Sequence, residues 1–264
     1  MAPAPQPWWR RALARATAGT GPRLSGEPTS ANGASSFHLT WALPPGPALA
    51  EVSAVLEVVV PPAVDRLYFW ALQVGFVGGG GDRGAAHVGL QWNGRHPRSR
   101  AVNWGGYAPG GGLLEGTASA LPSAPGDPNT RDYPREPGRP YRLRVSPSPG
   151  RAGGWRGEVV DEASGEATVV RDLLAGGEAL ARPVVWSEVF ARCDHPSVTV
   201  RWSRFEAVTA DGRRLAPTGL AVNYQAAAAG GCDNTVSLPD GHGGVLQVTN
   251  AERRPTPGGV IPLR

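Results

Sequence analysis

Lysine is absent from this chain, so all 26 basic side chains among its 264 residues are arginines. The absence excludes a Schiff-base lysine, a lysine general base and the lysine of a phosphate-binding loop. The glycine run 78–81 therefore predicts a flexible turn, since no Gly-Lys-Ser/Thr ending follows it. The Gly-x-Ser-x-Gly pattern of many serine hydrolases is absent as well. No cofactor is indicated.

Long apolar runs are also absent. No stretch of 18 or more apolar residues occurs, which excludes a membrane-spanning helix on length. The first residues carry the basic charge of an export signal, but Arg15 interrupts the apolar stretch that such a signal needs. We therefore expect no recognisable signal peptide. A cytoplasmic location, a true start upstream of Met1 and an unconventional export route remain as alternatives.

Clustered positive charge is missing, although the net charge is +4 and the pI is about 9.6. The arginines are scattered, with doublets at 10–11, 213–214 and 253–254. A nucleic-acid face needs basic side chains gathered on one surface. The pattern favours a solvated surface, and we expect no nucleic-acid partner.

Glycine and proline are abundant, at 37 and 27 residues, and they separate short hydrophobic runs. Such punctuation is typical of many short strands joined by tight turns. The clearest example is the stretch 68–107, which predicts three strands in a β-meander. Its first strand alternates in the period of two that places side chains on opposite faces of a sheet, with Phe69, Ala71, Gln73 and Gly75 on one side and Trp70, Leu72, Val74 and Phe76 on the other.

The rest of the chain predicts one all-β domain. Residues 1–35 lack apolar periodicity and predict a flexible tail, and residues 36–264 predict a single β-sandwich that includes strands near the C-terminus. Segments 155–161 and 166–171 predict a hairpin, and the stretch 172–181 predicts a short helix. The segment 108–140 predicts a long loop, suited to a lid, a binding loop or an insertion. Two antiparallel sheets in a jelly roll accommodate this pattern.

The two cysteines, Cys193 and Cys232, each precede an aspartate just outside a predicted strand. One pair in a loop-rich β protein favours a disulfide in an oxidising compartment. Such a bond would stabilise the fold by about 3 to 4 kcal/mol in the chain-entropy model. The alternatives are two separate thiols, a zinc site with His195 and His242, and a catalytic cysteine beside His195.

Paired carboxylates are the test for a glycosidase, because both mechanisms need two acids about 5 to 9.5 Å apart. The Glu-x-Asp-x-Glu string of sandwich glucanases is absent. Glu115 and Glu188 are the weak catalytic candidates, since each lies among apolar residues where burial would raise the pKa of a carboxyl group.

Aromatic residues supply the candidate ligand site. Trp186 and Trp202 are predicted to lie in the core. Trp92 and Trp104 lie beside glycine-rich turns, and we expect them to be exposed and able to stack on sugar rings. The predicted ligand-binding residues are Gln91, Trp92, Asn93, Trp104 and Tyr107.

Several motifs in order are similar to those of an uncharacterised bacterial family known as a domain of unknown function. They are Gly89 to Gly94 followed by 98–104, Leu114 to Thr117, 155–165 and 185–190, with 222–225, 231–235 and 247–250 resembling the C-terminal extension of secreted actinobacterial members. The resemblance covers roughly residues 37–263. It implies a concanavalin A-like β-sandwich, export, and action on or near carbohydrate, and it implies no catalytic residues.

Three hypotheses about function follow. The first is a non-catalytic module that binds a carbohydrate or another ligand, with a glycan as its partner. The second is a carbohydrate-active enzyme, a glycoside hydrolase or lyase, that uses an isolated glutamate. The third is a structural or surface-interaction protein. The sequence does not determine the oligomeric state.

Overall fold

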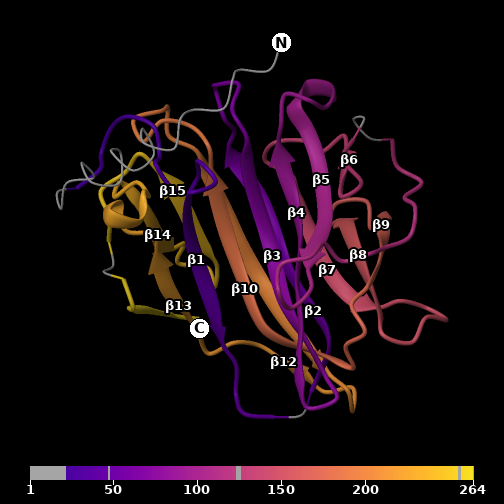
Figure 1. Ribbon diagram of the computed structural model, residues 1–264. Helices are drawn as coiled ribbons and strands as arrows, with labels where there is room; N and C mark the ends of the chain where they lie inside the picture. Colours follow the sequence, from indigo (N-terminus) through magenta and orange to yellow (C-terminus); the bar gives the residue numbers. More distant parts are fainter. Residues whose placement is uncertain (1–21, 47, 123–125, 255–256, 264) are drawn as a thin grey trace.

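The protein is described by a computed structural model over residues 22–46, 48–122, 126–254 and 257–263. The described part contains 16 strands, all in antiparallel pairs, and two short 3-10 helices (Figure 1). The strands are β1 (Ser35–Ala42), β2 (Leu49–Val60), β3 (Tyr68–Gly78), β4 (Gly81–Trp92), β5 (Arg100–Tyr107), β6 (Thr130–Asp132), β7 (Pro140–Pro147), β8 (Gly154–Asp161), β9 (Ala167–Leu174), β10 (Ala179–Val189), β11 (Thr199–Thr209), β12 (Arg214–Leu215), β13 (Gly219–Tyr224), β14 (Thr235–Pro239), β15 (Val245–Thr249) and β16 (Val260–Pro262). The helices are η1 (Pro97–Ser99) and η2 (Ala227–Ala229).

Strand pairing divides the fold into two layers. The front sheet has the order β16-β13-β1-β10-β3-β4-β5-β6, and the back sheet has the order β14-β15-β11-β2-β7-β8-β9, with β12 beside β11. The two sheets join at one point, where Leu180 of β10 pairs with Leu49 of β2. The predicted all-β sandwich of two antiparallel sheets is confirmed.

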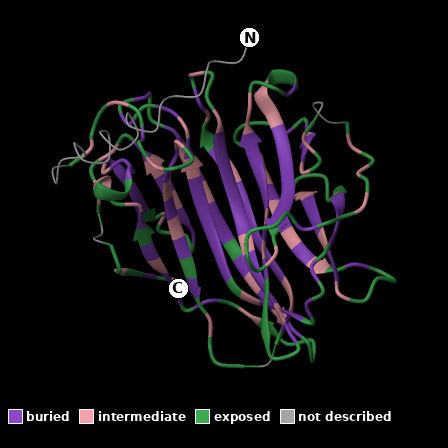
Figure 2. Cartoon of the chain, viewed as in Figure 1, coloured by how far each residue is buried: buried purple, intermediate pink, exposed green. Residues whose placement is uncertain are grey.

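Alternation along the strands decides which side chains fill the space between the sheets. In β3, Trp70, Leu72, Val74 and Phe76 are at most 1% exposed and belong to the main core. Trp41 of β1 meets Phe205 of β11 across the layers, with ring centroids 5.4 Å apart. Buried residues form a continuous band through the centre of the sandwich (Figure 2). The predicted meander is confirmed as β3, β4 and β5.

The helix predicted at 172–181 is wrong. Asp172, Leu173 and Leu174 are the last residues of β9, which pairs with β8 in the hairpin that the sequence predicted. The stretch 179–181 begins β10. The glycines at 176 and 177 separate these strands, and glycine in a helix interior is destabilising by about 1 kcal/mol relative to alanine. Sheet pairing on both sides therefore determines the structure of this segment.

The prediction of a flexible tail over residues 1–35 needs a correction at its C-terminal end. Residues 1–21 lie outside the described residues, and Ser35 already belongs to β1. Residues 22–34, here called the strap, lie against the end of the sandwich. Thr29 N–H donates to the carbonyl of Gly230 at 2.9 Å, and Cys193 N–H donates to the carbonyl of Gly26 at 2.8 Å. Backbone hydrogen bonds hold this segment although it has no apolar periodicity.

The disulfide prediction is confirmed. Cys193 and Cys232 are bonded, with their Cα atoms 5.4 Å apart. Both are buried, at 2% and 4% exposure, next to the strap. The bond joins the segment after β10 to the segment before β14. This excludes the zinc site and the catalytic cysteine, because neither sulfur is a free thiolate.

Candidate binding groove

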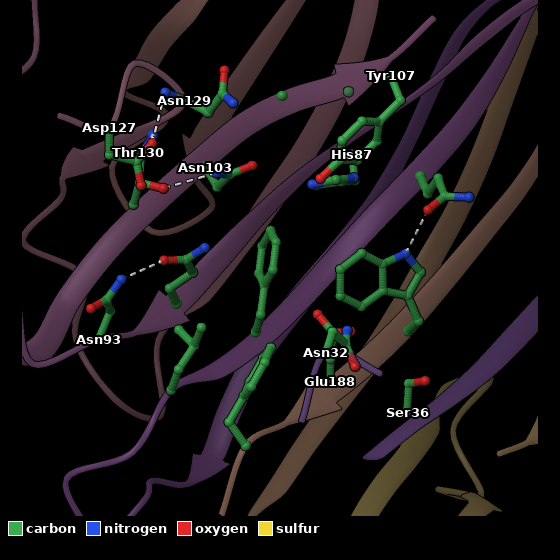
Figure 3. Close-up of a pocket in the computed structure, with 18 of the residues that line it drawn as sticks. Asn32, Ser36, His87, Asn93, Asn103, Tyr107, Asp127, Asn129, Thr130 and Glu188 are labelled. Atoms are coloured by element: carbon green, nitrogen blue, oxygen red, sulfur yellow. Dashed lines mark hydrogen bonds between the residues drawn. The ribbon is translucent and has the colours of Figure 1, made fainter. Parts of the chain in front are cut away.

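An open groove of about 800 Å³ lies on the outer face of the front sheet (Figure 3). The floor comes from the outward-facing residues of β10, β3, β4 and β5. The side occupied by Asn32, Ser36 and Glu188 is here called the Glu188 wall, and the opposite side, occupied by Asn103, Asp127, Asn129 and Thr130, is called the amide wall. The groove therefore crosses the strands.

Small residues keep the middle of the floor low. Trp186 pairs with Ala71, Ala71 pairs with Gly89, and Gly89 pairs with Asn103 in one row across four strands. A Cβ atom on Gly89 would lie 2.3 Å from the carbonyl oxygen of Trp70 and 2.7 Å from Cα of Ala71. Backbone atoms cannot yield at such distances, so the strands approach closely here only because residue 89 is glycine. Because residue 89 has no side chain and Ala71 has only a methyl group, space is left above the sheet in this row.

Three rings form a compact cluster on the floor. The centroid of Phe69 lies 4.9 Å from that of Trp186 and 5.4 Å from that of His87, and His87 lies 5.5 Å from Trp186. The indole Nε1 of Trp186 donates a hydrogen bond of 3.2 Å to Oε1 of Gln73. Burial lowers the pKa of His87 to about 4, so this imidazole is neutral at pH 7.

The Glu188 wall carries a carboxyl group with altered acidity. Burial raises the pKa of Glu188, and a hydrogen bond from Asn32 opposes that shift. Nδ2 of Asn32 donates to Oε1 of Glu188 at 2.8 Å. On the front sheet, Glu188 lies between Ser36 of β1 and Phe69 of β3. The carboxyl group is thus half-buried, and its hydrogen bond comes from an uncharged donor.

The amide wall has the opposite electrostatics. Burial favours the neutral form of Asp127, but hydrogen bonds from Thr130 and Asn129 outweigh it, so the pKa of Asp127 is lowered. The backbone N–H groups of Asn129 and Thr130 each donate to Oδ1 of Asp127 at 3.0 Å. Nδ2 of Asn103 donates to Oγ1 of Thr130 at 2.9 Å, whereas Oδ1 of Asn103 is buried and has no hydrogen-bond partner among the described residues. This wall presents one ionised carboxylate among amides.

The two carboxyl groups of the groove lie far apart. Glu188 is in β10, and Asp127 lies on the β6 side of β5. Three strand spacings separate β10 from β5, or about 14 Å. Glycosidases with two carboxylates place them about 5 to 9.5 Å apart. Among the described residues that line this groove, no pair of acids fits that mechanism.

Three of the five predicted ligand-binding residues line the groove. Gln91, Asn93 and Tyr107 do so, and Tyr107 is 53% exposed. Trp92 is half-buried and packs against the main core. It does not line the groove.

The predicted exposure of Trp104 is wrong. It is 0% exposed, and Nε1 donates to the carbonyl of Trp155 in the back sheet at 3.4 Å. Asn103, Gly105 and Tyr107 occupy the outer face of β5, so alternation turns Trp104 inward. The glycines that follow Trp104 predict an exposed side chain, but the alternation of side chains along β5 decides its direction.

The predicted burial of Glu115 is also wrong. Glu115 is exposed, lies outside the groove, and occupies the connection between β5 and β6, where no sheet covers it. Its backbone carbonyl accepts a hydrogen bond of 2.8 Å from Leu174 N–H, so the backbone at Glu115 holds this connection against the end of β9. Of the two glutamates singled out, the groove contains Glu188 only.

Trp202 and Trp186 were the two tryptophans predicted to lie in the core, and both are buried, but only Trp202 lies in the main core. Trp202 lies in the main core at 0% exposure, as predicted. Trp186 is buried at 6%, but it packs with Phe69, Ala71 and Val184 on the outer face of the front sheet. The sequence prediction missed Asn32, Asn103 and Trp186 as groove residues. The alternation that places Tyr107 outward also places Asn103 outward, so that signal was present, whereas none marked Asn32.

Within the described ranges, no group of three or more His, Cys, Asp or Glu side chains could hold a metal ion. No helix in the described part of the chain has the length and apolar character needed to cross a membrane.

Comparisons with known proteins find solved structures of low sequence identity. The chain matches no family model and no curated protein. Scytalido-glutamic peptidase, solved with a peptide-based transition-state analogue, is 12% identical with a TM-score of 0.46, covering 81% of this chain and 97% of that chain. SCP-B, a member of the eqolisin family of peptidases, is 10% identical with a TM-score of 0.43, covering 81% and 98%. Tailspike protein 2 of an Escherichia coli O157:H7 bacteriophage is 13% identical with a TM-score of 0.29, covering 71% and 21%. No role of any residue follows from these similarities.

Proposed function

We propose that this protein binds an uncharged glycan in the groove of the front sheet. The supporting observation is the lining of the groove, which combines side-chain amides on the amide wall with the exposed ring of Tyr107. Amides donate and accept hydrogen bonds at once, which suits the hydroxyl groups of a sugar. An exposed aromatic ring offers an apolar face and a polar tip. A concave site with a few polar groups is the usual form of a ligand site.

The electrostatics favour a ligand without charge. Burial lowers the pKa of His38 and of His87, so both imidazoles in the groove are neutral at pH 7. Burial also raises the pKa of Glu188, which favours its uncharged form. On the amide wall, the charge of Arg95 helps to lower the pKa of Asp127, so a cation accompanies that carboxylate. No excess of one sign is available to hold an ionic polymer.

Binding to a broad glycan array tests the proposal. We expect saturable binding by the wild-type protein, and at least a tenfold loss of affinity in Tyr107→Ala and in Asn129→Ala, because each removes a ligand contact of about 1.4 kcal/mol or more. Leu238→Ala is the matched control, since Leu238 is 36% exposed on β14, away from the groove. A folded protein that binds nothing on the array would contradict the proposal and favour a structural role.

A second candidate function is enzymatic, with Glu188 as a general acid. The observation that favours it is a half-buried carboxyl group, its pKa raised by burial, on the wall of the groove. General acids work best when they keep their proton near the working pH. The separation of Glu188 from Asp127 argues against a hydrolase with two carboxylates.

Replacement of the carboxyl group separates the two candidates. On a glycan identified by binding, Glu188→Gln should lower turnover by about 100-fold or more while the affinity changes little. Glu115→Gln is the matched control, because Glu115 is exposed outside the groove. Activity should be present below the raised pKa of Glu188 and lost as the pH rises through it. Unchanged turnover in Glu188→Gln would exclude this role.

A further inference from the structure

Asn32 reaches the groove from outside the front sheet. It belongs to the strap, three residues before β1 begins, and its Nδ2 lies 2.8 Å from Oε1 of Glu188. Figure 3 shows the two side chains together beside Ser36. The Glu188 wall therefore combines the strap, β1 and β10, and Asn32 is separated from Glu188 by 156 residues in the sequence.

The local turn fixes which end of the Asn32 amide meets Glu188. Oδ1 of Asn32 accepts a hydrogen bond from Ala34 N–H at 3.2 Å, and it lies 2.9 Å from the Ser30 hydroxyl, whose single proton is shared with the carbonyl of Ala34 at 2.5 Å. With the oxygen held on this side by the turn, the amide nitrogen points at the carboxyl group. Ser30, Asn32 and Ala34 thus present a donor in a defined direction.

The strap depends on the two segments that the disulfide joins. Cys193 N–H donates to the carbonyl of Gly26 at 2.8 Å, and Asp233 N–H donates to that of Arg23 at 2.9 Å. Nδ2 of Asn234 donates to the carbonyls of Leu24 at 3.2 Å and Cys193 at 2.8 Å. Both sides of the disulfide therefore bind the strap, and the bond keeps them together.

We propose that Asn32 is a positioning residue for Glu188, and that the disulfide-linked segments hold the strap so that Asn32 completes the groove wall. The Asn32 amide fixes the carboxyl group of Glu188 at one place in the groove through a directed hydrogen bond. The value of this contact to a ligand rests on the proposed function of the groove. The contact itself does not, so it can be tested without a ligand.

The surroundings of Glu188 contain no competing charge on the adjacent strands. β1 and β3 place Ser36 and Phe69 beside it, and neither side chain titrates in the range of a carboxyl group. The other titratable groups that line the groove are His38, His87, Arg95, Tyr107 and Asp127, and burial lowers the pKa of both imidazoles. The substitution of Asn32 removes none of these groups, so a difference between the Glu188 titrations of the wild type and the variant reports on the Asn32 contact.

Carbon-13 NMR of the Glu188 carboxyl group in the full chain tests the proposal. A hydrogen bond donated to a carboxylate favours its charged form, so Asn32→Ala should shift the titration midpoint to higher pH. Ser30→Ala should shift it in the same direction by less, because the turn loses the shared hydroxyl contacts to Ala34 and Asn32 while the Ala34 N–H bond to Asn32 remains. Asn223→Ala is the control, since Asn223 is exposed on β13 outside the groove and should leave the midpoint unchanged. An unchanged midpoint in a folded Asn32→Ala protein would overturn the proposal.

The role of the disulfide-linked segments needs a second pair of variants. Replacement of both cysteines by alanine, and separately Asn234→Ala, should move the Glu188 midpoint toward that of Asn32→Ala. Asn234→Ala keeps the disulfide and removes the side-chain bonds to Leu24 of the strap and to Cys193, so it answers the question if the cysteine variant unfolds. A wild-type midpoint in folded Asn234→Ala would show that the strap holds Asn32 without this support. Failure of glycan binding would leave these titrations intact.

Discussion

Replacing Cys193 and Cys232 together by alanine should lower the free energy of unfolding by about 3 to 4 kcal/mol. The bond closes a loop with a sequence separation of 39 residues, and its removal returns that conformational freedom to the unfolded chain. At about 2 to 4 °C per kcal/mol for a chain of this size, the melting temperature should fall by roughly 10 °C. Urea denaturation of both proteins under oxidising conditions measures the difference.

Wild-type protein measured with a reducing agent is the control for the cysteine variant. If the loss comes from the crosslink, the reduced wild type and the double alanine variant should have similar stabilities. Single alanine variants should match the double variant, because one cysteine alone forms no bond. Equal stability of the oxidised wild type and the double variant would show that the crosslink does not constrain the unfolded chain.

Replacing Trp104 by alanine should lower the free energy of unfolding by about 3 to 5 kcal/mol. The indole is 0% exposed and packs between the sheets, where its removal leaves a cavity. Because Trp104 does not line the groove, a folded Trp104→Phe protein should retain glycan affinity while it loses part of the stability. Normal stability with lost binding would restore the view of Trp104 as a ligand residue.

Gly157 provides the matched test of the Trp104 site. A Cβ atom on Gly157 of β8 would lie 2.5 Å from Cγ of Trp104. Gly157→Ala should therefore be destabilising by about 1 to 3 kcal/mol through overpacking. In the combined variant with Trp104→Ala, the added methyl group should cost less, since the clash is gone. Additive losses would show that the two residues do not touch.

The fold was predictable because one regular signal governs it. The alternation of Phe69 and Ala71 with Trp70 and Leu72 follows directly from the geometry of a strand, and the structure keeps it throughout β3. The same rule, applied to β5, would have turned Trp104 inward. The neighbouring glycines are the weaker signal for the side chain of Trp104, and the period of two is the stronger one.

The site was only partly predictable because its walls come from distant segments. Gln91, Asn93 and Tyr107 lie within the meander, where local patterns apply. Asn32 meets Glu188 through a hydrogen bond across 156 residues, and nothing near Asn32 in the sequence indicates that partner. The exposure of Glu115 likewise depends on whether distant strands pack over it, which its neighbours in the sequence do not indicate. Long-range pairing decides such positions, and a single sequence does not display it.

The strap also bears on the order of events during synthesis. Arg23 bonds to Asp233 across 210 residues, and β1 pairs with both β10 and β13 from the second half of the chain. These partners leave the ribosome long after the N-terminal segment has emerged, and non-local pairings of this kind form slowly. The strap and β1 therefore cannot complete their hydrogen bonds until Asp233, β10 and β13 are present. Binding competence should therefore arise only after β10, β13 and Asp233 have been synthesised, and a nascent chain that stops before them would lack one side of its groove.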